Sequence, residues 1–445
     1  MARTSPLRLG DRLRCLKTRQ SALLALCGLL LAPAGSAQTL SLQAAIQDAL
    51  ASQGQVRAAE HLRKADADLL QASRAAVLPQ LSLNTASIWS QSRNQQPLFV
   101  SANGPREVIG QFAVSVPLYA PQLWALRKLA RGQVDVATAT EQNARLRVAA
   151  RVLNAWYQLA LAQKRLAIWQ STFADTDTLL ADTQKAYRAG AASRLDVLQT
   201  ESLLTQARSG LQDAQAEADA ASRFLNLQVG LAPSTPLHLP LPHSLQSPLP
   251  KRATLEAQAD RNQPVLHLAA QQIEVGKARV GVQRSSLLPS LQGSVAYGVD
   301  TVTVPESRDL GWQAALRLHW QLFGFGQRRE QIAAAQQQLA ALKATRQALR
   351  LQIYSAIATD YGLAQVARRD QANARISLAQ AHGIYVMTRK GFFAGAMNAL
   401  NLAQAQSTWV KARLALASAQ IRSAMTQDQL ELDTGQYPGE GNPPT

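Results

Sequence analysis

The sequence repeats itself once, and this duplication limits the possible folds more than any other feature. Segment 78–81, Leu-Pro-Gln-Leu, recurs as Leu-Pro-Ser-Leu at 288–291. Three further pairs of segments match in the same order, at offsets of about 205 to 210 residues. These pairs are 116–119 with 320–323, 157–160 with 361–364, and 187–199 with 392–404. The chain must therefore bring together two equivalent units.

Each copy is predicted to consist of a helix, two strands, a long helix, a turn and a returning helix. Four stretches alternate apolar and polar residues, and their lengths suit a tilted membrane strand of roughly 9 to 11 residues. We expect strands at about 80–90, 107–119, 290–300 and 310–323. We expect helices at about 40–77, 121–188, 193–229, 253–287, 326–390 and 398–432. A half-buried soluble sheet is the alternative, but tryptophans near the strand ends favour a membrane interface: Trp89, Trp312 and Trp320.

The longest helices need neighbours to be stable. Between residues 121 and 187 only Gly132 weakens the helical pattern, and a helix of that length would span about 100 Å. Apolar residues recur at spacings of three and four, as in Leu146, Ala149 and Leu153. An isolated helix is marginally stable in water, so these residues are predicted to pack against other helices.

The remaining segments lie at the ends and between the copies. Residues 1–37 are predicted to be a signal peptide, followed by a first channel repeat at 38–230. A proline-rich connector at 231–252 leads to the second repeat at 253–433, and a disordered tail is expected at 434–445. The chain is therefore predicted to be exported from the cytoplasm.

The two cysteines both lie within the predicted signal peptide. Cys15 and Cys27 would be removed by cleavage after Ala37, which leaves no disulfide and no thiolate metal ligand. Leu26 precedes Cys27, whereas lipoprotein processing requires a small residue at that position. A lipid anchor is therefore not expected.

Charge and hydropathy exclude two classes of protein. The formal charge is +17, from 46 Lys and Arg against 29 Asp and Glu, and it falls to about +12 without the signal peptide. These cations are scattered along helices without interleaved aromatic residues, so nucleic-acid binding is not expected. After the signal peptide no segment approaches the roughly 18 apolar residues of a membrane-spanning helix, which argues against an ordinary inner-membrane protein.

No arrangement of residues predicts catalysis. The histidines outside the signal peptide form neither an HxxxH nor an HExxH pattern. They are His61, His238, His243, His267, His319 and His382. Segment 324–326, Gly-Phe-Gly, lacks the third glycine and the lysine of a phosphate-binding loop. We therefore expect no catalytic residue, no cofactor and no metal site, and the chain is not predicted to be an enzyme.

Together the motifs resemble those of the outer-membrane efflux protein family, the TolC-like channels. They are the two Leu-Pro-x-Leu segments, Leu-Phe-Gly-Phe-Gly-Gln-Arg-Arg at 322–329, and Tyr-x-x-Gly-x-x-Ser-x-Leu-Asp-Val-Leu at 187–198. The resemblance implies a mainly α-helical chain that contributes four strands to a membrane β-barrel. Three copies would form a 12-stranded barrel in contact with outer-membrane lipid, above a long α-helical periplasmic tunnel.

The same resemblance suggests which residues meet a partner. In such channels the helical turns lie at the periplasmic tip and contact a periplasmic adaptor, or membrane fusion, protein linked to an inner-membrane RND or ABC pump. The matching residues are Gly190, Ser193, Leu195, Gly395 and Leu400. The alternative is that they only build the turns.

The expected constriction of the tunnel departs from the family pattern. Relatives often carry rings of acidic residues where this chain has Asn401 and Gln404, and Phe392 replaces a tyrosine that can hold neighbouring helices together. Asp196 retains a carboxylate in the first copy. We therefore predict a weakly latched gate that multivalent cations block little.

The function implied by the resemblance is a passive exit channel for small molecules. The nearest alternative is the outer-membrane component of a type I protein secretion system, since such a tunnel does not select its pump. A more distant alternative is a soluble periplasmic coiled-coil scaffold. No nucleotide-binding motif is present, so a partner would have to supply the energy for transport.

Overall fold

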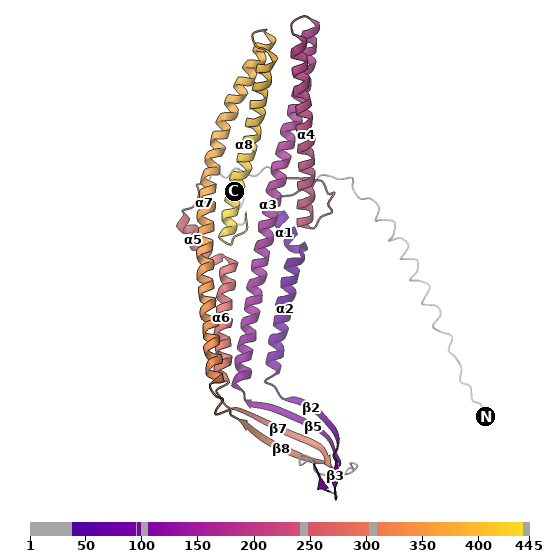
Figure 1. Ribbon diagram of the computed structural model, residues 1–445, viewed down its shortest axis with the longest axis vertical. Helices are drawn as coiled ribbons and strands as arrows, with labels where there is room; N and C mark the ends of the chain where they lie inside the picture. The colour runs from indigo at the N-terminus through magenta and orange to yellow at the C-terminus, as the bar shows by residue number, and fades with distance from the viewer. Residues whose placement is uncertain (1–37, 95, 99–105, 241–247, 302–308, 439–445) are drawn as a thin grey trace, which may run out of the picture.

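The computed structural model describes residues 38–94, 96–98, 106–240, 248–301 and 309–438. The predicted signal peptide, 1–37, lies outside these ranges. The chain is elongated, with two long helical hairpins at one end and a curved sheet at the other (Figure 1). Within the described ranges, no helix combines the length and the apolar character needed to cross a membrane.

Two helices of almost equal length run from the sheet to the opposite end (Figure 1). They are α3 (Pro121–Arg188, 68 residues) and α7 (Gln327–Phe393, 67 residues). Beside their far halves lie α4 (Arg194–Val229) and α8 (Ala399–Asp433). Beside the halves near the sheet lie α1 (Leu42–Ser52), α2 (Gly54–Ala75), α5 (Arg252–Asn262) and α6 (Pro264–Ser285).

The main sheet has the strand order β2-β5-β7-β8 and is antiparallel throughout. Its strands are β2 (Gln80–Trp89), β5 (Arg106–Tyr119), β7 (Ser290–Thr301) and β8 (Gly311–His319). The remaining strands form two small ladders. Strand β1 (Gln38–Thr39) pairs with β6 (Leu237–His238), and β3 (Ser92–Arg93) pairs with β4 (Gln96–Pro97). The two copies also share the same strand register. The pair Gln80–Ser115 of β2 and β5 corresponds to the pair Ser290–His319 of β7 and β8.

The first helix of each copy is broken, although the sequence predicted single helices at 40–77 and 253–287. Gln53 separates α1 from α2 and Gln263 separates α5 from α6, and both glutamines have extended backbones. The Gln53 Nε2 atom donates to the Gln228 carbonyl at 2.6 Å, and the Gln263 Nε2 atom donates to the Asp433 carbonyl at 2.9 Å. Each glutamine thereby satisfies a carbonyl group that the end of a returning helix would otherwise leave unpaired.

Three other segments differ from the sequence prediction. Strand β8 ends at His319 rather than near residue 323. Directly after the strand, the Trp320 indole donates to the Leu287 carbonyl at 3.1 Å. The connector contributes β6, which pairs with β1, while residues 241–247 lie outside the described ranges. The tail packs at its start, since Thr434 is buried and Tyr437 contacts the core. The rest of the tail, 439–445, is not described.

The largest core cluster lies where the two halves of the helical region meet. Helix α3 supplies Val152, Leu153 and Trp156, and the Trp156 indole donates to the Leu40 carbonyl at 3.1 Å. Across the copies, the Tyr157 hydroxyl donates to the Asp428 carboxylate at 2.6 Å. This core therefore ties the segment from Leu40 through α1 to both long hairpins.

Helix α8 ends in a half-buried acidic pair, Asp433 with Asp360 of α7. Burial is the main cause that raises the pKa of Asp433, and the hydrogen bond with Asp360 raises it further. The Asp433 Oδ1 atom accepts from the Gln429 amide at 3.0 Å, but its buried Oδ2 atom has no donor. Two carboxylates in contact need a shared proton, so ionisation of this pair is unfavourable.

We predict that Asp433→Asn stabilises the protein at alkaline pH. The raised pKa means that the neutral carboxyl stabilises the fold at low pH and that this contribution is lost as pH rises through the folded-state pKa. The asparagine stays neutral and its amide can donate to Asp360. The unfolding temperature should rise by about 2 °C at about pH 8 and by less at about pH 5. Asp219→Asn, at an exposed site on α4, is the control, and a lower unfolding temperature for Asp433→Asn at alkaline pH would contradict the assignment.

Candidate functional site

The sheet has one apolar face. Paired residues form a row across all four strands, and every side chain in this row is exposed. The row is Leu83, Phe112, Tyr297 and Trp312. The adjacent row on the same face is Leu81, Val114, Val295 and Ala314. A soluble protein would cover rows of this kind, so this face requires an apolar environment.

The opposite face of the sheet is polar and carries small side chains. One row is Asn84, Gln111, Gly298 and Gly311, and another is Gln80, Ser115, Ser294 and Ala315. Near the helices this face borders a cavity of 420 Å³, lined among others by Gln80, Gln292 and His319. Arg328 also lines it and donates to the Gln321 carbonyl at 2.8 Å. This face is suited to contact with water and polar solutes.

Both edges of the sheet are open. Strands β2 and β8 are the outermost strands, and all their residues are exposed. Among the described residues, neither edge has a second partner strand. Edge strands expose unpaired N–H and C=O groups and readily accept another strand.

At the other end of the molecule, two turns have nearly the same backbone. Gly190 follows α3 with φ +73°, and Gly395 follows α7 with φ +75°. The Ala191 amide donates to the Ala186 carbonyl at 2.8 Å, and the Ala396 amide donates to the Gly391 carbonyl at 2.9 Å. The left-handed conformation is easiest for glycine, which explains why both copies keep it at the turn.

The helices that follow the turns begin with different caps. In the first copy the Ser193 Oγ atom accepts from the Asp196 amide at 3.2 Å, and the Asp196 Oδ2 atom accepts from the Ser193 amide at 2.8 Å. This is a complete capping box. In the second copy the Asn398 side chain accepts from the Asn401 amide at 2.9 Å, and Asn401 provides no carboxylate in return.

Asp196 also joins the two hairpins. Its Oδ1 atom accepts from the amide of Ala399, the first residue of α8, at 3.3 Å. Partial burial acts to raise the pKa of Asp196, but the hydrogen bonds from Ser193 and Ala399 outweigh it and lower the pKa. The carboxylate therefore stays ionised at neutral pH and lies at the N-terminal, positive ends of two helices.

The other predicted site residues lie in two environments. Leu195 and Leu400 are exposed at the ends of their hairpins, and Asn401 and Gln404 are exposed on the first turns of α8. Phe392 is buried in a cluster that includes Leu179, Tyr385 and Leu402. The position expected to hold neighbouring helices therefore packs within its own chain.

Sequence reasoning missed Asn398 and Ala399. Asn398 could have been recognised, because asparagine immediately before an apolar periodic segment is a helix-capping signal. Ala399 acts only through its backbone amide, which no side-chain pattern marks. Within the described ranges, no group of three or more His, Cys, Asp or Glu residues could hold a metal ion.

The fold and the two-faced sheet define a class of protein. The structure matches the open-state outer membrane channel MtrE of Neisseria gonorrhoeae with a TM-score of 0.74. The match covers 89% of each chain at 17% identity, so it concerns the fold alone. The fold is therefore of the class found in this outer membrane channel, with a β-sheet at one end and long helical hairpins at the other.

The family follows from the sequence. The model of the outer membrane efflux protein family matches residues 45–231 and 255–436. The chain belongs to this family, and its location is the outer membrane.

Two curated relatives are similar over shorter regions. The toluene efflux pump outer membrane protein TtgF of Pseudomonas putida is 26% identical over 231 residues, which are 51% of this chain and 47% of TtgF. The protein CyaE of Bordetella pertussis is 27% identical over 333 residues, which are 72% of this chain and 69% of CyaE. The match with TtgF thus spans about half of that relative.

We predict that Asp196→Ala loosens both hairpins at neutral pH. The substitution removes the acceptor for the Ser193 and Ala399 amides, and a hydrogen bond to a charged group contributes about 1.5 to 3 kcal/mol. Hydrogen exchange measured by mass spectrometry should accelerate about tenfold or more in segments 190–199 and 395–402. Asn401→Ala, at the corresponding position of the second copy, should leave segment 190–199 unchanged. Unchanged exchange in segment 395–402 of Asp196→Ala would contradict the link between the hairpins.

Proposed function

We propose that this chain is the exit channel of a tripartite export system, in which three copies form a passive conduit for small molecules across the outer membrane. The observation that carries the proposal is the sheet, which has apolar rows on one face, polar rows on the other and two open edges. A membrane barrel requires the same combination: lipid outside, water inside and no unpaired edge.

The dimensions of the sheet support this proposal. Strand β2 has 10 residues, and at about 3.3 Å per residue it is about 33 Å long. Tilted by about 40°, as barrel strands are, it would cross an apolar band of about 25 Å. The strand therefore suits the outer membrane without a change of length.

Closure requires several copies. Four strands are too few to enclose a barrel, since about eight already leave an interior that side chains fill. The chain has an even number of alternating strands, so β8 of one copy would meet β2 of the next in antiparallel orientation. Three copies would then supply 12 strands, and their six helical hairpins would form the tunnel with approximate sixfold symmetry.

The duplication predicts the strand register between copies. Gln111 of β5 pairs with Gly298 of β7 where the two repeats meet within one chain. The repeats would meet again where β8 of one copy contacts β2 of the next. There Ala315 takes the place of Gln111, because 320–323 matches 116–119, and Ile88 takes the place of Gly298, because 78–81 matches 288–291. We therefore expect Ala315 to face Ile88 of the next copy.

A disulfide test follows from this register. The variant Ile88→Cys with Ala315→Cys should form covalent dimers and trimers after oxidation in outer-membrane preparations, because directly opposed Cβ atoms lie about 5 Å apart. The described residues contain no cysteine of their own. The control variant combines Ile88→Cys with Leu316→Cys. In this variant the two cysteine side chains would project from opposite faces of the sheet. Equal cross-linking of both variants, or none in either, would contradict the register.

The helical tips are proposed to dock onto a periplasmic adaptor protein that is bound to an inner-membrane RND or ABC pump. Gly190, Ser193, Leu195, Gly395 and Leu400 lie at the free ends of the hairpins, and all are exposed. The relative TtgF is named as the outer membrane protein of an efflux pump. A type I secretion system would export a polypeptide through the same conduit. The two alternatives, small-molecule efflux and polypeptide secretion, differ in which inner-membrane pump works with this channel when it is expressed in a strain that lacks its own outer-membrane channel.

The gate is predicted to be insensitive to divalent cations. Asn401 and Gln404 carry no charge, and the Asp196 carboxylate is hydrogen-bonded within its own chain. Purified protein in planar bilayers should therefore show discrete conductance steps that millimolar divalent cations on the tip side leave unchanged. Asn401→Asp should introduce cation block. Strong block of the unmodified protein would contradict this view of the gate, and the absence of any conductance would contradict the channel itself.

A further inference from the structure

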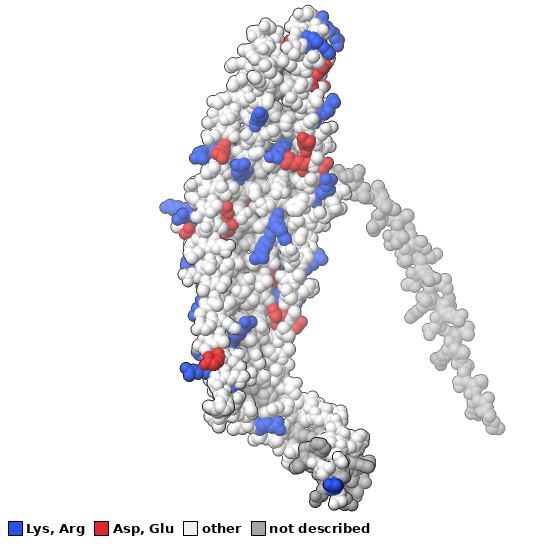
Figure 2. All heavy atoms as spheres, viewed as in Figure 1, with Lys and Arg blue, Asp and Glu red and all other residues white. Residues whose placement is uncertain are grey.

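Two arginines flank the turn at the end of the first hairpin. Arg188 is the last residue of α3 and Arg194 is the first residue of α4, and both are exposed. Figure 2 shows Lys and Arg side chains gathered at the free end of the α3–α4 hairpin. Leu195 lies next to them, with 62% of its surface exposed. We call Arg188 and Arg194 the arginine apex.

The arginine apex has no carboxylate partner in the part of the chain that the structure describes. Among the described residues, neither arginine forms a salt bridge. The carboxylate nearest to Arg194 in sequence, Asp196, uses both oxygens for the Ser193 and Ala399 amides. The one nearest to Arg188 in sequence, Asp182, pairs with Lys185. Arg194 also lies on the first turn of a helix, where the helix dipole disfavours a cation. Arg194 therefore does not stabilise the local structure. A residue that is unfavourable for the local structure often takes part in binding.

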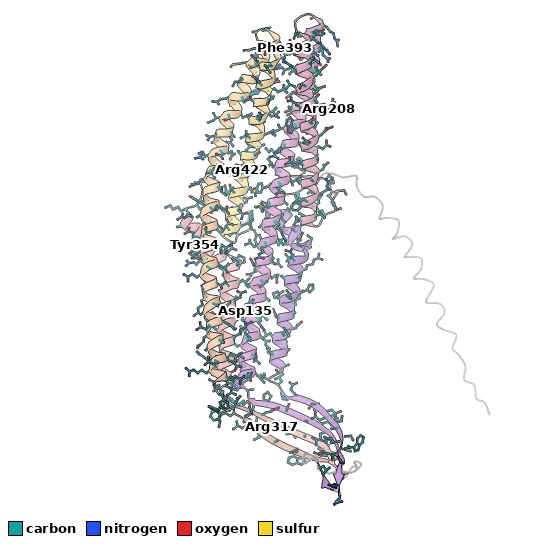
Figure 3. All side chains as sticks on the ribbon, in the orientation of Figure 1. Asp135, Arg208, Arg317, Tyr354, Phe393 and Arg422 are labelled. Carbon is teal, nitrogen blue, oxygen red and sulfur yellow. The ribbon has the colours of Figure 1, made fainter. Side chains whose placement is uncertain are left out.

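The second hairpin shows that the turn does not need these arginines. Gly190 and Gly395 have nearly equal φ angles, and the hydrogen bonds of the two turns correspond. The residues that match Arg188 and Arg194 are Phe393 and Ala399. Phe393 is 46% exposed at the end of the second hairpin (Figure 3). The same backbone therefore presents two arginines in one copy, and Phe393 with Ala399 at the matching positions of the other, where Lys390 in the last turn of α7 is the nearby exposed cation.

We infer that the arginine apex binds carboxylates at the tip of a helical hairpin in the periplasmic partner, and that the second hairpin makes an apolar contact instead. The inference rests on the proposed function, since it specifies the chemistry of the docking tip. Guanidinium groups bind carboxylates through paired hydrogen bonds, and exposed opposite charges accelerate association. In the assembled channel, three tips that carry the arginine apex would alternate with three tips that carry Phe393, so the partner's hairpins would meet two kinds of site.

The experiment uses synthetic probes. Helical hairpin peptides of one sequence, closed by a disulfide and carrying glutamates, glutamines or lysines at the turn, are titrated onto the purified full-length channel by fluorescence anisotropy. The glutamate peptide should bind about tenfold tighter than the glutamine peptide at about 50 mM salt, and this preference should shrink at about 300 mM. Arg188→Glu with Arg194→Glu should remove the preference and favour the lysine peptide.

Two controls make the outcome specific. Lys251→Glu with Arg261→Glu reverses two exposed charges in and before α5, far from the tips, and should keep the preference. Phe393→Arg adds a cation to the second hairpin and should strengthen binding of the glutamate peptide. Equal binding of the glutamate and glutamine peptides would overturn the inference, as would loss of the preference in the α5 variant.

Two further measurements separate the possible failures. Conductance is recorded on the same preparations: normal conductance without a peptide preference would refute only the arginine apex, whereas absent conductance would refute the proposed channel. Vesicles of anionic phospholipid serve as a competitor. Arginine-dependent binding to vesicles as tight as binding to the glutamate peptide would overturn the inference in favour of a lipid-bound tip.

Discussion

The pairing of backbone groups at the edges of the sheet is the constraint on which the rest of the molecule depends. Strands β2 and β8 each expose one row of N–H and C=O groups. Within lipid, each unpaired group would cost several kcal/mol. In the proposed trimer, the antiparallel order and the shared register would let the edges of successive copies satisfy one another. The long helices would then continue the ring that the strands define, because α3 begins at Pro121, next to the end of β5 at Tyr119, and α7 begins at Gln327, after a short segment that follows β8.

Much of the fold could be predicted because its signals are local or repeated. Alternating residues marked the strands, and the segment matches ordered the elements. The break at Gln263 could have been predicted, because Pro264 follows it and the residue before a proline is biased away from the helical conformation. The break at Gln53 could not, because glutamine is a good helix former and its partner, the Gln228 carbonyl, is distant in sequence. The acidic pair at Asp433 escaped notice for the same reason.

The tip was only partly predictable. Glycine at both turns and serine before α4 carry known conformational preferences, so the positions of Gly190, Gly395 and Ser193 could be identified. The contact between Asp196 and the Ala399 amide depends on how two hairpins approach in space, and no sequence spacing encodes it. Asp196 was therefore identified as a carboxylate near the constriction, while its role as a cap for two helices required the structure.

The equal registers of the two ladders have an evolutionary consequence. A chain of half this length, carrying one repeat, would meet identical neighbours on both sides, and six such chains would build the same wall as three of these. Fusion replaces half of the encounters between separate chains by encounters within one chain, which raises the effective concentration of the joined halves. It also releases the halves from being identical. Arginine in one turn and phenylalanine in the other are differences that a ring of six equal chains could never acquire.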